Sequence, residues 1–236
     1  MIRRLTFLFI LSLSASASSS AYAQNDPFEE VNLITHSINS QIDRDFAVPI
    51  ARAYVNFMPD RLEIGVSNFV ANYEDINNGI NNILQGKITK GFSDIARLII
   101  NTTIGVVGII DVASKLGLEK HDEDFGQTLG YWGIPSGPYI VLPGYGPSSL
   151  RDTVARIPDA FLGGLFFVSH ERTSYELTLV DALETRARYL GMESLIAGDE
   201  YLFYRDAFFQ SREYEINDGV MNDSFDDFDT EFEDDF

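Results

Sequence analysis

The side chains that most often carry enzymatic or metal chemistry are few and widely spaced in this sequence. His36, His121 and His170 lie far apart, and no two of them have the four-residue spacing that joins metal ligands on one helix. We expect them at the surface or at helix ends. Cysteine is absent, and so are the G-x-S-x-G, H-E-x-x-H and G-x-x-x-x-G-K-[ST] patterns of hydrolases, zinc enzymes and NTPases. The sequence predicts no catalytic residue, no metal site and no cofactor, and a lipid hydrolase would have only scattered Ser, His and Asp residues.

The segment from Gly144 to Ser149 superficially resembles a phosphate-binding loop. It lacks the lysine of such loops, and no strand is predicted before it. A turn that leads into a helix capped by Ser148 accounts for the same residues. A second interpretation stays open, in which the exposed start of that helix holds a lipid phosphate with Arg151 nearby.

Asp111 is a carboxylate inside an apolar run, between Ile110 and Val112. In such surroundings it must find a partner or face water, because a buried unpaired charge is costly. One interpretation is a cap or a salt bridge within the fold, with Arg97 or the pair Arg151 and Asp152 as candidate partners. The other is that Asp111 lines a polar channel.

The elements that must position these side chains are predicted to be helices, and we expect an all-α fold. The clearest pattern is an apolar residue every three or four positions from Leu62 to Ile83, with Gly86 where a helix commonly stops. Further amphipathic segments are predicted over residues 26–39, 50–58, 89–100, 148–156, 174–190 and 199–214, and Pro158 is expected to end the fourth. No useful strand alternation is present. Glycine and proline between residues 124 and 147 predict fixed turns.

Two apolar stretches, residues 99–113 and 160–168, are shorter than the roughly 20 residues that a helix needs to cross a bilayer. Glycines interrupt both of them. They are either buried core helices or segments that lie within one leaflet of a membrane. Composition alone leaves both interpretations open.

The amino terminus has the three parts of a secretory signal. Arg3 and Arg4 precede an apolar run, and small residues end at Ala23, so we expect residues 1–23 to be cleaved. The absence of cysteine leaves no residue for a disulfide or for a lipid anchor.

The net charge of −19 is unevenly distributed. No basic residue follows Arg212, and residues 213–236 contain 11 acidic ones, so we expect a helical domain over residues 24–212 and a disordered acidic tail. Four phenylalanines in the tail have a spacing that also fits a helix formed on binding a basic groove: Phe225, Phe228, Phe232 and Phe236. An acidic body argues against nucleic-acid binding and against polybasic attachment to anionic lipid.

Seven short motifs follow one another in a fixed order. They are Asn25–Asn32, Gly65–Phe69, Leu84–Lys87, Asn101–Ala113, Glu123–Gly133, Gly137–Pro143 and Gly146–Asp152. Together they resemble the MlaA (VacJ) family of outer-membrane phospholipid-transport proteins over residues 25–218.

The resemblance implies a ring-like helical domain at the periplasmic face of the outer membrane, with a central polar passage. Through it, mislocalised phospholipids would be withdrawn from the outer leaflet to maintain lipid asymmetry, without catalysis. The implied partners are phospholipids, an outer-membrane porin trimer and a periplasmic carrier of the MlaC type.

In this light we assign two sets of candidate residues. The lipid-passage candidates are Asn101, Asp111, Arg151 and Asp152. The membrane-facing candidates are Ile104, Val107, Ile110, Phe161, Leu162, Leu165, Phe166 and Phe167.

Members of the family are typically lipoproteins with a cysteine just after the signal, whereas here Ala23 precedes Gln24 and no cysteine exists. Anchoring would depend on the apolar surface and on partners. The alternative hypothesis is therefore a soluble periplasmic lipid-binding or scaffold protein.

Overall fold

The structure is a computed structural model that describes residues 26–167, 171–196 and 198–220; for residues 163–167, 171–177 and 194–195 only the backbone is described. The signal peptide, His170 and the four tail phenylalanines lie outside this part of the chain. The elements, in order, are α2 Glu29–Ile42, the π-helix η1 Asp43–Ala47, α3 Val48–Phe57, α4 Asp60–Leu84, α5 Ile88–Thr103, η2 Ser114–Leu116, α6 Phe125–Tyr131, β1 Tyr139–Leu142, β2 Gly146–Ser149, α7 Leu150–Phe167, α8 Glu171–Arg188, η3 Met192–Leu195 and α9 Glu200–Ile216.

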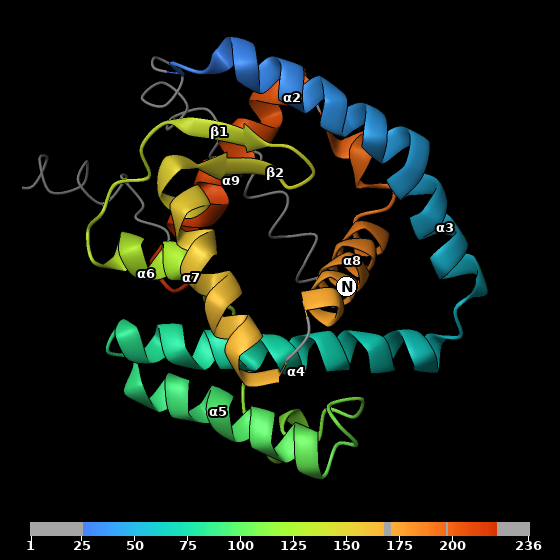
Figure 1. Cartoon of the computed structure of the whole chain (residues 1–236), viewed down its shortest axis with the longest axis vertical. Coiled ribbons are helices and arrows are strands. Elements are labelled where there is room, and N and C mark those ends of the chain that lie inside the picture. Colours follow the sequence, from blue (N-terminus) through green and yellow to red (C-terminus); the bar gives the residue numbers. More distant parts are fainter. Residues whose placement is uncertain (1–25, 168–170, 197, 221–236) are drawn as a thin grey trace, which may run out of the picture.

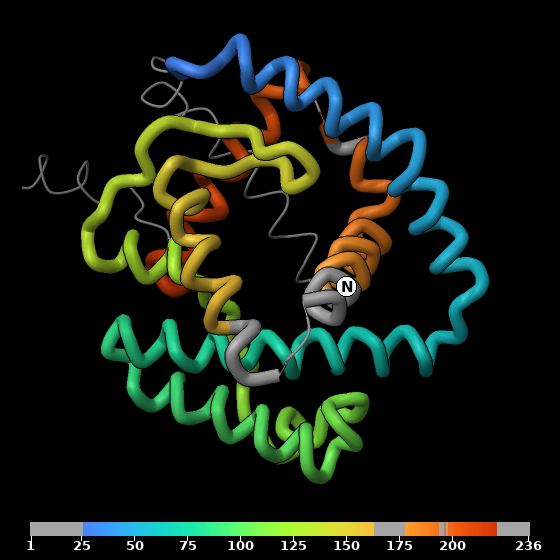
Figure 2. Tube along the Cα trace, in the orientation of Figure 1, coloured from blue at the N-terminus to red at the C-terminus, as the bar shows by residue number. Residues whose placement is uncertain are grey.

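The described helices are arranged as a ring around a central region (Figures 1 and 2). The continuous helix α2–η1–α3 forms one side, and α4 crosses the opposite side with α5 packed against its outer face. Helices α7 and α8 border the centre from two sides, and the β1–β2 hairpin packs on α9 beneath α2. The predicted ring of helices is confirmed.

The strongest predicted helix is also confirmed. Helix α4 runs from Asp60 to Leu84, and the chain turns at Gly86, whose φ of +79° favours glycine. Helices α4 and α5 approach closely because both lack side chains at their crossing: a Cβ on Gly91 would lie 2.7 Å from the carbonyl oxygen of Gly79. This contact fixes α5 against the outer side of the ring.

The prediction for residues 146–158 was wrong in two respects. The segment Gly146–Ser149 is a strand, paired antiparallel with Tyr139–Leu142, so the helix begins at Leu150 and is capped by the Ser149 hydroxyl, which accepts from the amide of Asp152 at 3.1 Å. The helix then passes through Pro158 to Phe167. Proline removes one helical hydrogen bond, and that loss did not end the helix.

Two asparagines on α2 attach the hairpin to the ring. Asn32 donates to the carbonyl of Tyr139 at 3.0 Å and accepts from the amide of Val141 at 2.8 Å. Seven residues on, Asn39 donates to the carbonyl of Leu142 at 2.9 Å and accepts from the amide of Gly144 at 2.9 Å. Asn32 thus takes the place of a neighbouring strand beside β1, and Asn39 does so at the end of β1 and the turn that follows.

A small aromatic core fills the space on the other face of the hairpin. Tyr139, Val141, Tyr201 and Phe209 are buried together, and Phe208 packs against them. The Tyr201 hydroxyl donates to the Asp26 carboxylate, which also accepts from the Asn32 amide at 3.1 Å. Asn32 is therefore the point where α2, the hairpin and α9 meet.

Substituting Asn32→Ala should destabilise the fold by about 3 kcal/mol, because it leaves a buried carbonyl and a buried amide of β1 without partners. Thermal unfolding of the full chain in detergent measures the loss. The control is Asn56→Ala on the exposed face of α3, which should leave the midpoint unchanged. Equal midpoints for Asn32→Ala and the wild type would contradict the role of Asn32.

Candidate functional site

The ring has an inverted distribution of side chains. Asparagine, aspartate and arginine side chains are buried, whereas large aliphatic side chains are exposed along α2, α3, α5 and the loop after α5. On α5, for example, Asp94, Arg97 and Asn101 are buried while Phe92 and Ile99 are exposed. A protein that folds in water alone buries the opposite set. Contiguous exposed apolar surface of this kind marks contact with lipid or with another protein.

A polar stripe on α4 joins it to its neighbours. The carbonyl oxygen of the Asn78 side chain accepts from the amide of Glu123 at 3.0 Å, and its amino group donates to the carbonyl of His121 at 2.8 Å. Gln85 donates to Glu123 at 2.7 Å and to Thr128 at 3.1 Å. These bonds fix the loop before α6, and α6 itself, against α4.

The first two lipid-passage candidates, Asn101 and Asp111, lie together. Asn101 donates to Asp111 at 3.1 Å and accepts from the amide of Val112 at 2.8 Å. Asp111 also pairs with Arg97 at 3.3 Å and accepts from Ser114. Burial acts to raise the pKa of Asp111, but the bonds from Ser114 and Asn101 and the charge of Arg97 outweigh it and lower that pKa to about 2.

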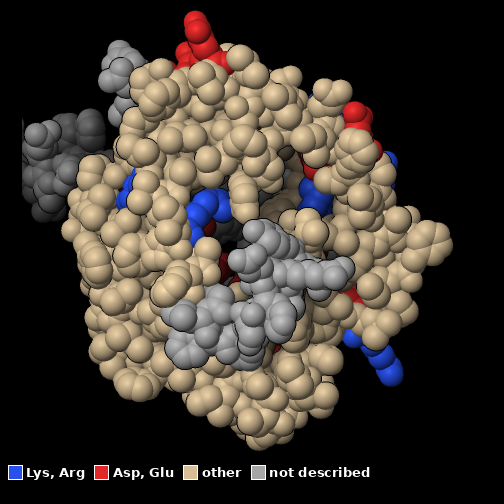
Figure 3. Space-filling view, in the orientation of Figure 1, with Lys and Arg blue, Asp and Glu red and all other residues tan. Residues whose placement is uncertain are grey.

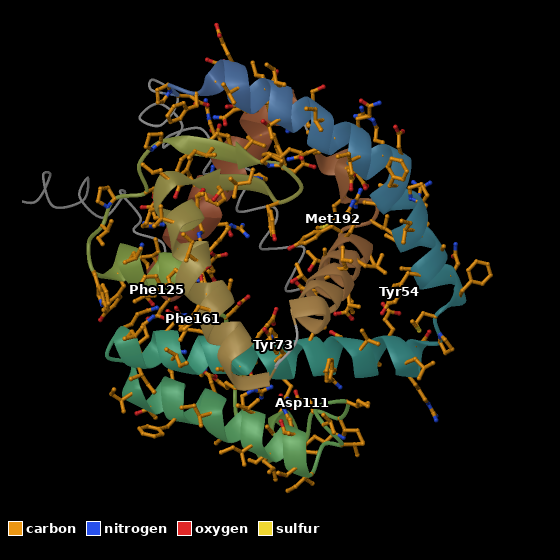
Figure 4. The ribbon with its side chains drawn as sticks, viewed as in Figure 1. Tyr54, Tyr73, Asp111, Phe125, Phe161 and Met192 are labelled. Atoms are coloured by element: carbon orange, nitrogen blue, oxygen red, sulfur yellow. The ribbon has the colours of Figure 1, made fainter. Side chains whose placement is uncertain are left out.

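The salt-bridge interpretation of Asp111 is confirmed, with Arg97 as the partner. In Figure 4, Asp111 lies on the outer side of α4, away from the centre of the ring. Tyr73, also labelled there, lies on the side of α4 that borders the centre. A role of Asp111 in lining a channel stays a prediction.

The other two candidates, Arg151 and Asp152, form a separate cluster at the start of α7. Arg151 pairs with Asp152 at 2.9 Å and donates to the carbonyl of Ile134 at 3.2 Å. Arg212 of α9 reaches Asp152 at 3.3 Å and Asp124 at 2.7 Å. Although burial acts to raise the pKa of Asp152, the charge of Arg212 and the bonds from Arg151 and Ser149 lower it.

The start of α7 is closed to a phosphate ligand. Its first two amides, of Leu150 and Arg151, donate to the carbonyls of Pro138 and Ser136, each at 3.0 Å, and the third, of Asp152, donates to Ser149. Arg151 is itself buried. The alternative in which this helix end holds a lipid phosphate was therefore wrong, and the turn with a helix cap is what the structure contains.

Deep between α4 and α5 lies a buried carboxylate with few partners. Asp75 is fully buried, and the Nε atom of Arg97 lies 3.5 Å from its Oδ2 atom. Neither carboxylate oxygen accepts a hydrogen bond from the part of the chain that the structure describes. Burial dominates and raises the pKa of Asp75 to about 7, in spite of the charges of Arg97 and Lys120.

The histidines have structural neighbours. The Nδ1 atom of His121 lies 2.7 Å from Asp94, and burial, opposed by this contact, raises the pKa of Asp94. His36 packs against the rings of Tyr201 and Tyr204. Within the described ranges, no three His, Asp or Glu side chains are grouped so as to hold a metal ion.

The membrane-facing candidates that the structure describes are mostly exposed. Ile104, Val107 and Ile110 expose 64%, 56% and 43% of their surface, and Phe161 exposes 65%. Leu162 is half-buried, and the structure describes only the backbone of Leu165, Phe166 and Phe167. Helix α5 ends at Thr103, and the chain then turns. The interpretation of residues 99–113 as a buried core helix was wrong.

Figure 3 shows that one face of the molecule is hollowed near its centre. Basic atoms lie at the rim of the hollow and acidic atoms deeper inside, whereas most of the surrounding surface in this view is uncharged. None of the described helices combines the length and the apolar character that crossing a membrane requires.

Together the ring, its polar interior and its apolar exterior define a class of helical protein whose outer surface suits lipid. The family described as MlaA lipoprotein matches residues 24–215. The chain therefore belongs to the MlaA family, as its seven motifs predicted.

Curated relatives and a solved structure agree with this assignment. The intermembrane phospholipid transport system lipoprotein MlaA of Escherichia coli (strain K12) is 32% identical over 213 residues, 88% of this chain and 84% of that protein. The protein of the same description from Haemophilus influenzae is 31% identical over 214 residues, 85% of this chain and 83% of that one. A solved structure described as the basis for maintenance of bacterial outer membrane lipid asymmetry matches at 32% identity with a TM-score of 0.75, covering 82% of this chain and 100% of its own.

Sequence reasoning missed the polar face of α4, made mostly of asparagines, that builds the site. Asn72, Asp75, Asn78, Asn82 and Gln85 recur every three or four residues, opposite a face that looked like the one to be buried. The signal that could have identified this face was the type of its residues. A solvated helix face usually carries lysine and glutamate, whereas a face made of asparagine indicates bonding within the protein.

Substituting Asp75→Asn should flatten the dependence of stability on pH. The pKa of Asp75 is raised from its ordinary 3.8 to about 7, so its contribution to stability is complete below about pH 4 and is lost as the pH rises through 7. Unfolding midpoints between pH 5 and pH 8 should fall less in the variant than in the wild type. The exposed Asp45→Asn serves as control, and parallel curves for wild type and Asp75→Asn would contradict the assignment.

Proposed function

We propose that this protein carries out non-enzymatic phospholipid transport between envelope membranes, withdrawing mislocalised phospholipids from the outer leaflet of the outer membrane and so maintaining lipid asymmetry. The observation that carries the proposal is the inverted ring, with buried polar side chains and exposed aliphatic ones. Lipid tails can cover the exterior, and a charged headgroup requires a polar route, because its transfer through hydrocarbon is costly.

The relatives support the proposal. Proteins about one-third identical to this chain over most of its length are described as lipoproteins of an intermembrane phospholipid transport system. The matched structure is described in terms of outer-membrane lipid asymmetry. Because the identity extends over the whole ring, we infer the same transport for this chain.

We further propose a location at the periplasmic face of the outer membrane, with a porin trimer and a periplasmic carrier of the MlaC type as partners. The exposed apolar side chains of α2, α3 and α5 support burial in a single leaflet. The four passage candidates would act by holding the walls of the ring. Asn101 and Asp111 fasten the loop after α5, and Arg151 and Asp152 join α7 to the turn after α6 and to α9.

Deleting the gene tests the function directly. We expect phospholipid to become exposed on the cell surface and sensitivity to detergent to rise, and both should be reversed by the wild-type chain. An unchanged cell surface would sink the proposal. Fractionation addresses the alternative of a soluble lipid-binding or scaffold protein, which predicts recovery of the chain in a wash without detergent or carbonate.

The leaflet contact makes a separate prediction for the loop after α5. The double substitution Ile104→Asp with Ile110→Asp should reduce binding to phospholipid vesicles by at least about tenfold, because an aspartate in hydrocarbon costs up to about 3 kcal/mol. Flotation of purified protein with vesicles measures this. Thr185→Asp adds a negative charge at an exposed polar position of α8 and should float like the wild type. Equal flotation of the double variant would show that this loop lies outside the lipid.

A further inference from the structure

A cavity of about 540 Å³ lies between α2, the hairpin, η3 and the start of α9. These elements meet on the inner side of the ring (Figure 1). The cavity has the size of a small-molecule site. Its lining includes His36, Asp43, Arg44, Glu193, Glu200 and Tyr204.

Two of the three acidic side chains in this lining are already paired with the same arginine. Arg186 of α8 holds Asp43 through two bonds, of 2.6 and 2.9 Å, and Glu193 through a third, of 2.5 Å. A bidentate contact of this kind is strong and fixes both groups. Asp43 and Glu193 therefore belong to the wall of the cavity and are engaged before any ligand arrives.

The remaining charges, Arg44 and Glu200, are of opposite sign and both are exposed. Neither makes an ion pair with any residue in the described ranges. They come from different elements, η1 and α9, so the cavity offers one available cation and one available anion. Burial and the charge of Glu200 both raise the pKa of Tyr204. The electric field of the Glu200 carboxylate therefore reaches the side chain of Tyr204.

The backbone explains how the adjacent residues Asp43 and Arg44 serve two purposes, one as a partner of Arg186 and the other as a free charge in the cavity lining. Residues 43–47 form a π-helix between α2 and α3, with more residues per turn than an α-helix. Asp43 reaches Arg186 while Arg44, the next residue, also lines the cavity. Such segments are frequent at functional sites.

We propose that this cavity binds the zwitterionic headgroup of a phospholipid, a phosphodiester that carries an ammonium group. Arg44 binds the phosphate, and Glu200 binds the ammonium beside the ring of Tyr204. The inference rests on the proposed phospholipid transport and adds selectivity to it. A headgroup that has the phosphate but no ammonium, such as that of phosphatidylglycerol, satisfies Arg44 but leaves Glu200 without a partner, so it binds less well.

The test equilibrates the full chain in detergent with mixed micelles of phosphatidylethanolamine and phosphatidylglycerol in equal amounts, reisolates it and measures the bound lipids by mass spectrometry. We expect about threefold enrichment of phosphatidylethanolamine, the effect of one or two partly exposed ion pairs. Arg44→Gln and Glu200→Gln should each bring the bound ratio back to the bulk ratio, and Glu200→Lys should favour phosphatidylglycerol. Matched controls are Arg52→Gln and Glu213→Gln, at exposed positions outside the cavity lining, which should retain the enrichment.

Three results would overturn the proposal: no enrichment in the wild type, the same enrichment in Arg44→Gln and Glu200→Gln, or equal loss in the controls. The same headgroup chemistry could come from a lipid or from a soluble compound, and a lipid-free experiment with glycerophosphoethanolamine separates the two. Binding of this soluble compound without enrichment of the lipid would assign the cavity to a soluble phosphodiester. Total bound lipid distinguishes the two proposals. Lipid carried at the bulk ratio refutes selectivity and leaves transport standing, whereas absence of bound lipid counts against transport itself.

Discussion

Hydrogen bonds from asparagine side chains hold this ring together. With its aliphatic side chains on the outside, the protein has little apolar surface to bury between its own elements, so polar bonds must join them. Asparagine suits this task because one short side chain carries both a donor and an acceptor. Asn39 satisfies a carbonyl and an amide of the hairpin at once, and Asn78 does the same for the loop before α6. Away from water, such bonds are electrostatically stronger, and leaving one unmade is costly.

The same constraint connects the fold to transport. An exterior of isoleucine, valine and phenylalanine can rest in lipid, while the interior keeps amides, carboxylates and guanidinium groups in fixed positions. Charges in the wall are paired wherever they support the fold, as Arg186 with Asp43 and Arg212 with Asp124. Only a polar interior offers a headgroup contacts comparable to those it leaves in water.

The sequence predicted the long helices because their periodicity is local. Helices α4, α5, α8 and α9 lie within a few residues of their predicted bounds. The hairpin was missed because its strands have only four residues each, and β1 is completed by Asn32 and Asn39, more than 100 residues away in the chain. The continuation of α7 through Pro158 was missed for a similar reason. Proline removes one helical hydrogen bond, and the packing of the helix against other elements decides whether the helix continues.

The candidate site was only partly predictable. Asp111 was identified because a carboxylate in an apolar run demands a partner, and Arg97 was among the candidates. The partnership of Arg186 with Asp43 joins residues 143 positions apart, which no local pattern encodes. The side of each helix that faces inward was also ambiguous, because periodicity identifies an apolar face without saying whether protein or lipid covers it.

An interior of amides has a thermodynamic consequence. The heat capacity of unfolding rises with apolar surface newly exposed to water and falls with polar surface. Unfolding this ring exposes many buried amides and charged groups but only a few buried aliphatic side chains. Its heat capacity change per residue should therefore lie below the roughly 12–15 cal/mol/K typical of globular proteins. The stability curve would then be broad and shallow, so that the free energy of unfolding changes little with temperature.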